Sequence, residues 1–320
     1  MGLTQEWAEW TDAMFDGLNN SKNNIQRSFE KVNKSGSKGL EALLSSFHSL
    51  SDTESKSILR LFDQGGYFEE IVPGHEALIN AGNRGIIVNF LTEGLEKLDY
   101  TLKDIESFVQ SEEVYKDDST KFLGIFTSAA IRAVAKPGDT VKIKSLKPID
   151  YLFTWVKKIN AYVDVAGDNL AEFAYGSKIH ANVAGYYAGH GIKKSKLYIQ
   201  NAGEGLALTA RDSEINFDKA GEYAINNAHN CIIRGKTAGK YLGDNMENSK
   251  LYIEKINGNL GQVYNNGDIL LHNKIYKNGL PYLPFLVKKG LINSFYSCKS
   301  FLKEDLPTIL RLNDDEVFPI

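Results

Sequence analysis

The chain contains few cysteines and carries no excess of basic residues. Its 320 residues include only two cysteines, Cys231 and Cys298, which argues against a disulfide framework and predicts a reducing compartment. A formal net charge of −3 supplies no positive field for a phosphate backbone, so no nucleic acid is expected as a partner. With 42% hydrophobic and 24% charged residues, the composition is typical of a soluble globular protein.

Long apolar segments are also missing. The most apolar helix-like stretch, residues 122–135, includes Arg132 and is shorter than a transmembrane helix, so it fits a buried helix instead. The first ten residues, MGLTQEWAEW, show no basic flank followed by an apolar core, so no export signal is expected. These features predict a cytoplasmic protein that does not insert into a membrane.

Helical periodicity dominates the first part of the chain. Ser51 and Glu54 have the pattern of a capping box ahead of a helix, and the stretch at 136–139, KPGD, is a stop signal after the apolar helix. The sequence therefore predicts a helical bundle at 1–137 and a connector with entry to the next domain at 138–158. Two of the predicted apolar helix faces are Leu40, Leu43, Leu44 and Phe47, and Leu95, Leu98, Leu102 and Ile105.

Glycine recurs at every eighteenth position in the middle of the chain. An alanine precedes each of these glycines, which are Gly167, Gly185, Gly203, Gly221 and Gly239. Five Ala-Gly pairs at one period are not expected by chance, so the segment is a repeat. The pentapeptide SKLYI occurs at 195–199 and again at 249–253, and its two copies are three periods apart.

Aligning the repeats on the glycine places apolar residues in columns. One column holds Ala161, Ile179, Leu197, Ile215, Ile233 and Leu251. The next column, two residues further along, holds Val163, Ala181, Ile199, Phe217, Gly235 and Ile253. Alternation with a period of two is typical of a short strand with one buried face. An amphipathic helix could not keep this register through the glycines, whereas a β-solenoid with 18-residue turns can.

The repeat predicts a single-stranded β-helix of about six turns over residues 159–275. At a strand spacing of about 4.8 Å, six turns would form a prism about 29 Å long. Both ends of such a stack expose strand edges that need cover, and residues 276–320 are expected to form a C-terminal cap or arm. The predicted fold class is α+β, with the helical domain and the solenoid as separate domains.

The stretch from Gly235 to Ile253 resembles one unit of the GXGXG repeat. This repeat builds the C-terminal domain of the glutamate synthase large subunit and one of the subunits of formylmethanofuran dehydrogenase. The resemblance covers about residues 159–275, and it implies a right-handed β-helix that organises neighbouring domains or subunits and carries no chemistry itself. The matching residues are Gly235, Ala238, Gly239, Gly243, Met246, Leu251 and Ile253.

Two carboxylates follow the repeat glycine in consecutive turns. Glu204 and Glu222 would have Cα atoms about 5 Å apart, with Lys240 next in the same column. Two carboxylates at that distance can divide the roles of acid and base. However, Lys240 can neutralise one of them, and Asp168 and Tyr186 share the column. The sequence therefore favours a solvated row of charges over a catalytic pair.

An outward column of aromatic and polar residues is the second surface feature. Its candidate binding residues are Tyr162, His180, Tyr198 and Tyr252. Aromatic rings beside amides can bind a polysaccharide or a partner strand, although aromatic residues are also favoured on β-surfaces for packing alone. In a cytoplasmic protein, another protein is the favoured ligand of this face.

No other group of residues has a recognisable catalytic or metal-binding pattern. The six histidines are scattered without cysteine or carboxylate at metal-ligand spacing, and Cys231 stands where most turns have serine, which predicts a small packed side chain. We therefore expect no metal and no cofactor. The sequence favours a non-catalytic structural or assembly protein that binds another protein. The alternatives are a carbohydrate-binding module on the tyrosine column and an enzyme that uses the carboxylate pair.

Overall fold

The computed structural model describes residues 26, 29, 35–48, 76–115, 120–257, 264–265 and 268–271. Two compact units divide the chain, Met1–Ala135 and Lys136–Ile320. Two predictions lie outside the described residues, namely the capping box at Ser51 and Glu54 and the C-terminal cap or arm at 276–320.

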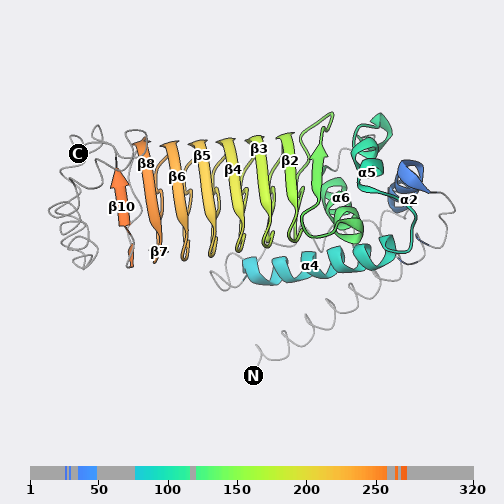
Figure 1. Ribbon diagram of the computed structural model, residues 1–320, viewed down its shortest axis with the longest axis horizontal. Helices are drawn as coiled ribbons and strands as arrows, with labels where there is room; N and C mark the ends of the chain where they lie inside the picture. Colours follow the sequence, from blue (N-terminus) through green and yellow to red (C-terminus); the bar gives the residue numbers. More distant parts are fainter. Residues whose placement is uncertain are drawn as a thin grey trace, which may run out of the picture. The chain divides into compact units, whose positions relative to one another are not determined.

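Helices form the described part of the first unit (Figure 1). They are α2 (Gly36–His48), α4 (Glu76–Leu95), α5 (Leu102–Phe108), the 3-10 helix η2 (Glu112–Tyr115) and α6 (Thr120–Val134). On α2 the predicted apolar residues Leu40, Leu43 and Leu44 are buried. Across the part of the chain that the structure describes, no helix is both long and apolar enough to cross a bilayer.

Helix α6 is buried on nearly all sides, as the apolar stretch predicted. Residues 122–131 have no exposed member. Its two buried hydroxyl groups are satisfied within the helix, because Thr127 Oγ1 donates to Leu123 O and Ser128 Oγ donates to Gly124 O, both at 2.7 Å. The helix ends at Val134, just before the predicted stop signal.

The predicted continuous helical face from Leu95 to Ile105 is wrong. Helix α4 ends at the first residue of this range, and α5 begins only at Leu102. Thr101 Oγ1 accepts a hydrogen bond from Asp104 N–H at 3.3 Å, and Asp104 Oδ2 accepts one from Thr101 N–H at 2.8 Å. These two bonds form a capping box, which starts a new helix at this point. The side-chain hydrogen bond from Thr101 also holds the pKa of Asp104 below its ordinary value.

The second unit contains an eight-stranded parallel sheet in the order β1-β2-β3-β4-β5-β6-β8-β10, and Figure 1 shows the strands in a row. Short strands β7 (Met246–Glu247) and β9 (Tyr264–Asn265) pair separately. The second unit is therefore a parallel β-solenoid of about six turns, as predicted. The eight strands are β1 (Thr140–Ile143), β2 (Asn160–Val165), β3 (Lys178–Ala184), β4 (Lys196–Ala202), β5 (Glu214–Ala220), β6 (Ile232–Ala238), β8 (Lys250–Ile256) and β10 (Asp268–Leu271).

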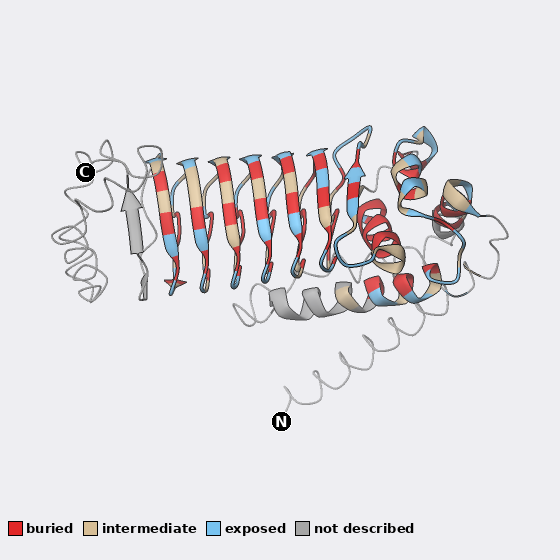
Figure 2. Cartoon of the chain, in the orientation of Figure 1, coloured by how far each residue is buried: buried red, intermediate tan, exposed pale blue. Residues whose placement is uncertain are grey.

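Strand register follows the 18-residue period. Ala161 pairs with Ile179, and Ile179 pairs with Leu197. Buried and less buried residues alternate over the first four residues of β2, β3, β4, β5 and β8, which is visible as coloured bands in Figure 2. Both predicted inward columns therefore face the core, as the two-residue alternation required.

The first strand of the sheet is β1, which lies inside residues 138–158, the segment predicted as a connector to the solenoid. Thr140 pairs with Asn160, so the offset between these strands exceeds the period of the repeat. The glycine period could not reveal this strand, because the turn that joins β1 to β2 is two residues longer than the others.

Left-handed backbone at alternate positions shapes the corner after each long strand. Asn169, Ala171 and Phe173 have φ values of 58°, 58° and 53°. Asn169 N–H donates forward to Tyr186 O at 2.8 Å, whereas Ala171 N–H donates back to Leu152 O at 2.7 Å. Hydrogen bonding between turns therefore continues around the corners, which offsets the cost of about 1 kcal/mol or more for each left-handed non-glycine residue.

The repeat glycines mark where the backbones of successive turns touch. A Cβ atom on Gly203 would lie 2.9 Å from Gly185 C, and a Cβ atom on Gly221 would lie 2.8 Å from Glu204 N. Gly221 N–H also donates to Gly203 O at 3.0 Å. None of these glycines has a left-handed φ, so the period exists because a side chain has no room.

Gly235 has a different role, in the packing of the core. A Cβ atom at this position would lie 2.2 Å from ring carbons of Phe217 and 2.6 Å from Ile253 Cδ1. The large ring of one turn therefore occupies the space that the glycine of the next turn leaves, which keeps the column close-packed.

We expect Gly221→Ala to destabilise the solenoid by about 2 to 3 kcal/mol, because the new methyl group overlaps backbone that cannot move away. Gly138→Ala is the matched control. Gly138 has a φ of 94°, and a Cβ atom there would have no neighbour within 4 Å, so this variant should lose only about 1 kcal/mol from backbone strain. Urea unfolding followed by circular dichroism measures both, and equal losses would contradict the contact explanation.

Candidate functional site

The outward column brings three of its four predicted binding residues together. Tyr162 pairs with His180, and His180 pairs with Tyr198. The ring centroids are 4.7 Å apart in the first pair and 4.6 Å in the second, with interplanar angles of 10° and 8°. We call these three residues the aromatic ladder.

Stacking determines which atoms the aromatic ladder can offer a ligand. Each face of the His180 ring lies against a tyrosine ring, so His180 can offer a ligand only its ring edge. Burial, with a smaller contribution from Lys178, lowers the pKa of His180, which favours the neutral imidazole. A sugar binds an aromatic residue through an open ring face, so this arrangement suits hydrogen bonding to a protein better than stacking with a sugar.

Tyr252, the fourth predicted residue, is not part of the aromatic ladder. Asn216 and Arg234 stand between it and Tyr198 in the column. The Arg234 guanidinium lies 5.7 Å from the Tyr252 ring centroid, and its Nη1 lies 3.0 Å from Glu214 Oε1. Beyond Tyr198 the column is therefore a charged network instead of a stack.

Glu214 is the centre of that network. Lys196 Nζ lies 2.7 Å from Glu214 Oε2, and Asn216 Nδ2 donates to Glu214 Oε1 at 3.4 Å. The hydrogen bond from Lys196 is the main reason that the pKa of Glu214 lies below its ordinary value. The same contact raises the pKa of Lys196.

The predicted carboxylate pair lies in consecutive turns, where one member has a cation. Lys240 Nζ lies 3.5 Å from Glu222 Oε1, with both side chains partly exposed. Glu204 is exposed. Glu222 therefore belongs to a partly exposed ion pair with Lys240.

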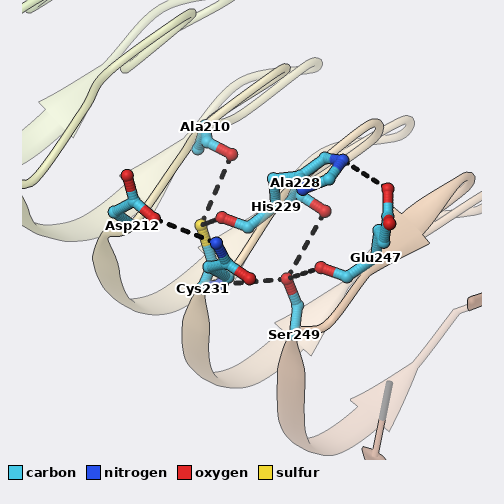
Figure 3. Close-up of polar contacts among 8 residues, drawn as sticks. Ala210, Asp212, Ala228, His229, Cys231, Glu247 and Ser249 are labelled. Carbon is cyan, nitrogen blue, oxygen red and sulfur yellow. Dashed lines mark hydrogen bonds and ion pairs between the residues drawn. The ribbon is translucent and has the colours of Figure 1, made fainter. Parts of the chain in front are cut away.

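A ladder of small polar side chains runs through the solenoid core at the position of Cys231. The Ser195 hydroxyl donates to Lys193 O at 2.9 Å and accepts from Ser177 N–H at 3.2 Å. Cys231 has the same place (Figure 3): its Sγ donates to His229 O at 3.2 Å, and its N–H donates to Ser249 Oγ at 3.0 Å. Burial raises the pKa of the Cys231 thiol, which disfavours the reactive thiolate.

The structure also brings together a group that the sequence did not indicate. Glu172 is fully buried, and its Oε1 lies 3.5 Å from Nδ1 of His190. The His190 ring packs against Phe173, with centroids 5.3 Å apart, and Phe173 stacks on Trp155 at 4.8 Å. Sequence reasoning assigned His190 no specific partner, because the 18-residue spacing of Glu172 and His190 matters only after the turns are stacked.

Titratable residues in the described ranges do not cluster as a metal site would require, since no group of three or more His, Cys, Asp or Glu side chains could hold an ion. Within those ranges, the chemistry of the solenoid surface is that of hydrogen bonds, stacked rings and ion pairs.

Glu214→Gln should lower the free energy of unfolding at pH 7 and have little effect in acid. The folded-state pKa of Glu214 is depressed, so its stabilisation is present above the unfolded value of about 4.3 and is lost as the pH falls through the folded-state value. Urea midpoints from pH 7 to pH 2 measure this difference. Glu204→Gln is the control, because Glu204 makes no ion pair among the described residues. If the effect of Glu214→Gln on the free energy of unfolding did not change with pH, the explanation would be wrong.

Cys231→Ser should keep the free energy of unfolding within about 0.5 kcal/mol, because serine keeps the donor to His229 O and the small volume. Cys231→Ala has nearly the same size but no donor, and should cost about 1 to 3 kcal/mol. Thermal unfolding compares the two variants. If alanine were tolerated as well as serine, the hydrogen-bonding role of this column would be wrong.

In comparisons with known proteins, no protein-family model, no curated protein and no solved structure matches this chain.

Proposed function

We propose that this chain is a non-catalytic assembly protein whose solenoid presents a rigid face to another protein. The observation that carries the proposal is the aromatic ladder, in which Tyr162, His180 and Tyr198 are stacked at 4.6 to 4.7 Å and held in strand register. Side chains that are already ordered lose little conformational entropy on binding. Such a surface favours recognition of a partner without a change in shape.

The chemistry of the other candidate groups supports the same proposal. Glu222 has Lys240 as its counterion, and Cys231 is buried in a hydrogen-bonded ladder with a raised pKa. Neither group has the environment of an activated nucleophile or of a general acid. The surface is therefore better suited to binding than to catalysis.

The proposal includes finer features that follow from the resemblance and the helical pattern. They are a right-handed path of the solenoid, a helical bundle at 1–137 that provides a second docking surface, and a role in organising neighbouring subunits in the cytoplasm. A rigid repeat domain next to a helical domain suits the joining of two partners.

The test is purification of the tagged full-length chain from its native cell at low salt, with co-purifying proteins quantified by mass spectrometry. We expect a partner at stoichiometric amount. Tyr198→Ala, which removes one end of the aromatic ladder, should reduce the recovered partner about tenfold. Tyr223→Ala is the matched control, because Tyr223 is an exposed tyrosine stacked on Tyr241 in a different column.

Three results would have distinct meanings. Recovery of the chain alone would overturn the assembly function. A partner that Tyr198→Ala and Tyr223→Ala retain equally would leave an assembly protein but overturn the role of the aromatic ladder. Loss of the partner in Tyr198→Ala alone would support both.

A further inference from the structure

On three columns of the solenoid, opposite charges on successive turns lie side by side. Lys196 pairs with Glu214 at 2.7 Å, Lys236 with Asp218 at 2.9 Å, and Lys240 with Glu222 at 3.5 Å. His229 Nε2 lies 2.5 Å from Glu247 Oε2 of the next turn, as Figure 3 shows. The members of each lysine pair are one period apart in the sequence, so the stacking of turns places a carboxylate next to a cation.

One edge of the solenoid departs from this pattern. The residues around the short bridge that follows each corner are exposed and basic in the earlier turns, and we call this set the basic ridge. Its members are Lys157, Lys158, Lys178, Lys193, Lys194, Lys196 and Arg211.

Like charges are in direct register on the basic ridge. Lys178 pairs with Lys196 in the ladder between β3 and β4, and Lys193 pairs with Arg211 in an isolated bridge. Cross-strand neighbours of the same charge destabilise a sheet. The like charges of the ridge therefore destabilise the fold, whereas opposite charges in register, such as Lys196 and Glu214, would stabilise it.

Most basic side chains of the ridge make no ion pair with a carboxylate among the described residues. Among the described residues, Lys196 is the one ridge member with an ion pair, to Glu214. Lys194 instead lies over the ring of Tyr175, with Nζ 5.9 Å from the centroid. Asp212, next to Arg211 in the sequence, accepts a hydrogen bond from Asn230 Nδ2 at 3.1 Å. Exposed, adjacent cations that make no ion pair are available to a ligand of opposite charge.

We propose that the basic ridge is the docking site for an acidic, extended segment of the partner protein. This inference rests on the proposed assembly function and names the chemistry of one partner surface. The turn of Lys157 and the turn of Arg211 are separated by three turn spacings, which is a distance of about 14 Å along the solenoid axis. An extended segment of about four to five residues covers that length, and carboxylates on its alternate residues, about 6.7 Å apart, would be within reach of the long basic side chains of the ridge.

Several observations favour an acidic protein segment over a nucleic acid. The whole chain has a net charge of −3, so a long polyanion would be repelled beyond the ridge. The same turns carry Asp164, Asp168 and Glu204 at other positions, which limits favourable contact to a short ligand. The neighbouring rings of Trp155 and Phe173 stack on each other at 4.8 Å, so they offer a poor platform for bases.

The test uses the full-length chain and a fluorescein-labelled eight-residue peptide that alternates Glu and Gly, with binding followed by fluorescence anisotropy at low salt. We expect saturable binding that weakens as salt is added. The double variant Lys193→Glu and Lys194→Glu should weaken binding at least tenfold. The control double variant Lys219→Glu and Lys255→Glu makes the same charge change at exposed residues of another column and should change binding less than twofold.

Arg211→Glu separates loss of binding from loss of folding. A carboxylate at this position would face Lys193 in register, as Glu214 faces Lys196, so the variant should unfold at the same or a higher temperature while it binds the peptide more weakly. A variant that is destabilised but binds normally would overturn the proposal.

Other outcomes are equally decisive. Absence of peptide binding, or equal loss in both double variants, would overturn the ridge as the docking site. Tighter binding of a single-stranded oligothymidine than of the acidic peptide, with the same ridge dependence, would overturn the choice of a protein segment. If the native partner still co-purifies with the Lys193→Glu and Lys194→Glu variant at the normal level, the assembly function survives and only the ridge is excluded.

Discussion

Close contact between the backbones of successive turns is the constraint on which the solenoid depends. At Gly203, Gly221 and Gly239 the space for a Cβ atom is already occupied by the preceding turn. Because the turns meet at these glycines, all the remaining residues of one turn are held at strand spacing from the equivalent residues of the next turn. Backbone hydrogen bonds then run between turns both in the strands and around the left-handed corners.

That fixed spacing converts the repeat into rows of identical environments. Inward rows form a core of aliphatic side chains, the row of Ser195 and Cys231 forms a buried hydrogen-bonded ladder, and outward rows form stacks or ion pairs. A side chain in a row contacts the residue one period away more than its neighbours in sequence. Surface chemistry is therefore organised along the solenoid axis.

The same organisation links stability to function. Three charged rows place opposite signs side by side, whereas the basic ridge repeats one sign at Lys193 and Arg211. The aromatic ladder, by contrast, uses the spacing to order His180 between two tyrosines. One surface is thus stabilised by its own contacts, and the other is left with charge for a ligand to neutralise.

How much of this could be predicted from the sequence depends on whether a feature is periodic. The glycine period and the alternation of apolar residues determined the solenoid, its inward columns and the neighbours of Tyr162, His180 and Tyr198, because turns of equal length place equivalent residues in register. The first strand, β1, was missed since its turn has a different length, and the face from Leu95 to Ile105 was misread since a capping box ends the periodic pattern. Only the tertiary structure decided the pairing of Glu172 with His190, the stacking of the rings and the partner of each charge. Those depend on side-chain direction and distance, which a period of residues along the chain does not specify.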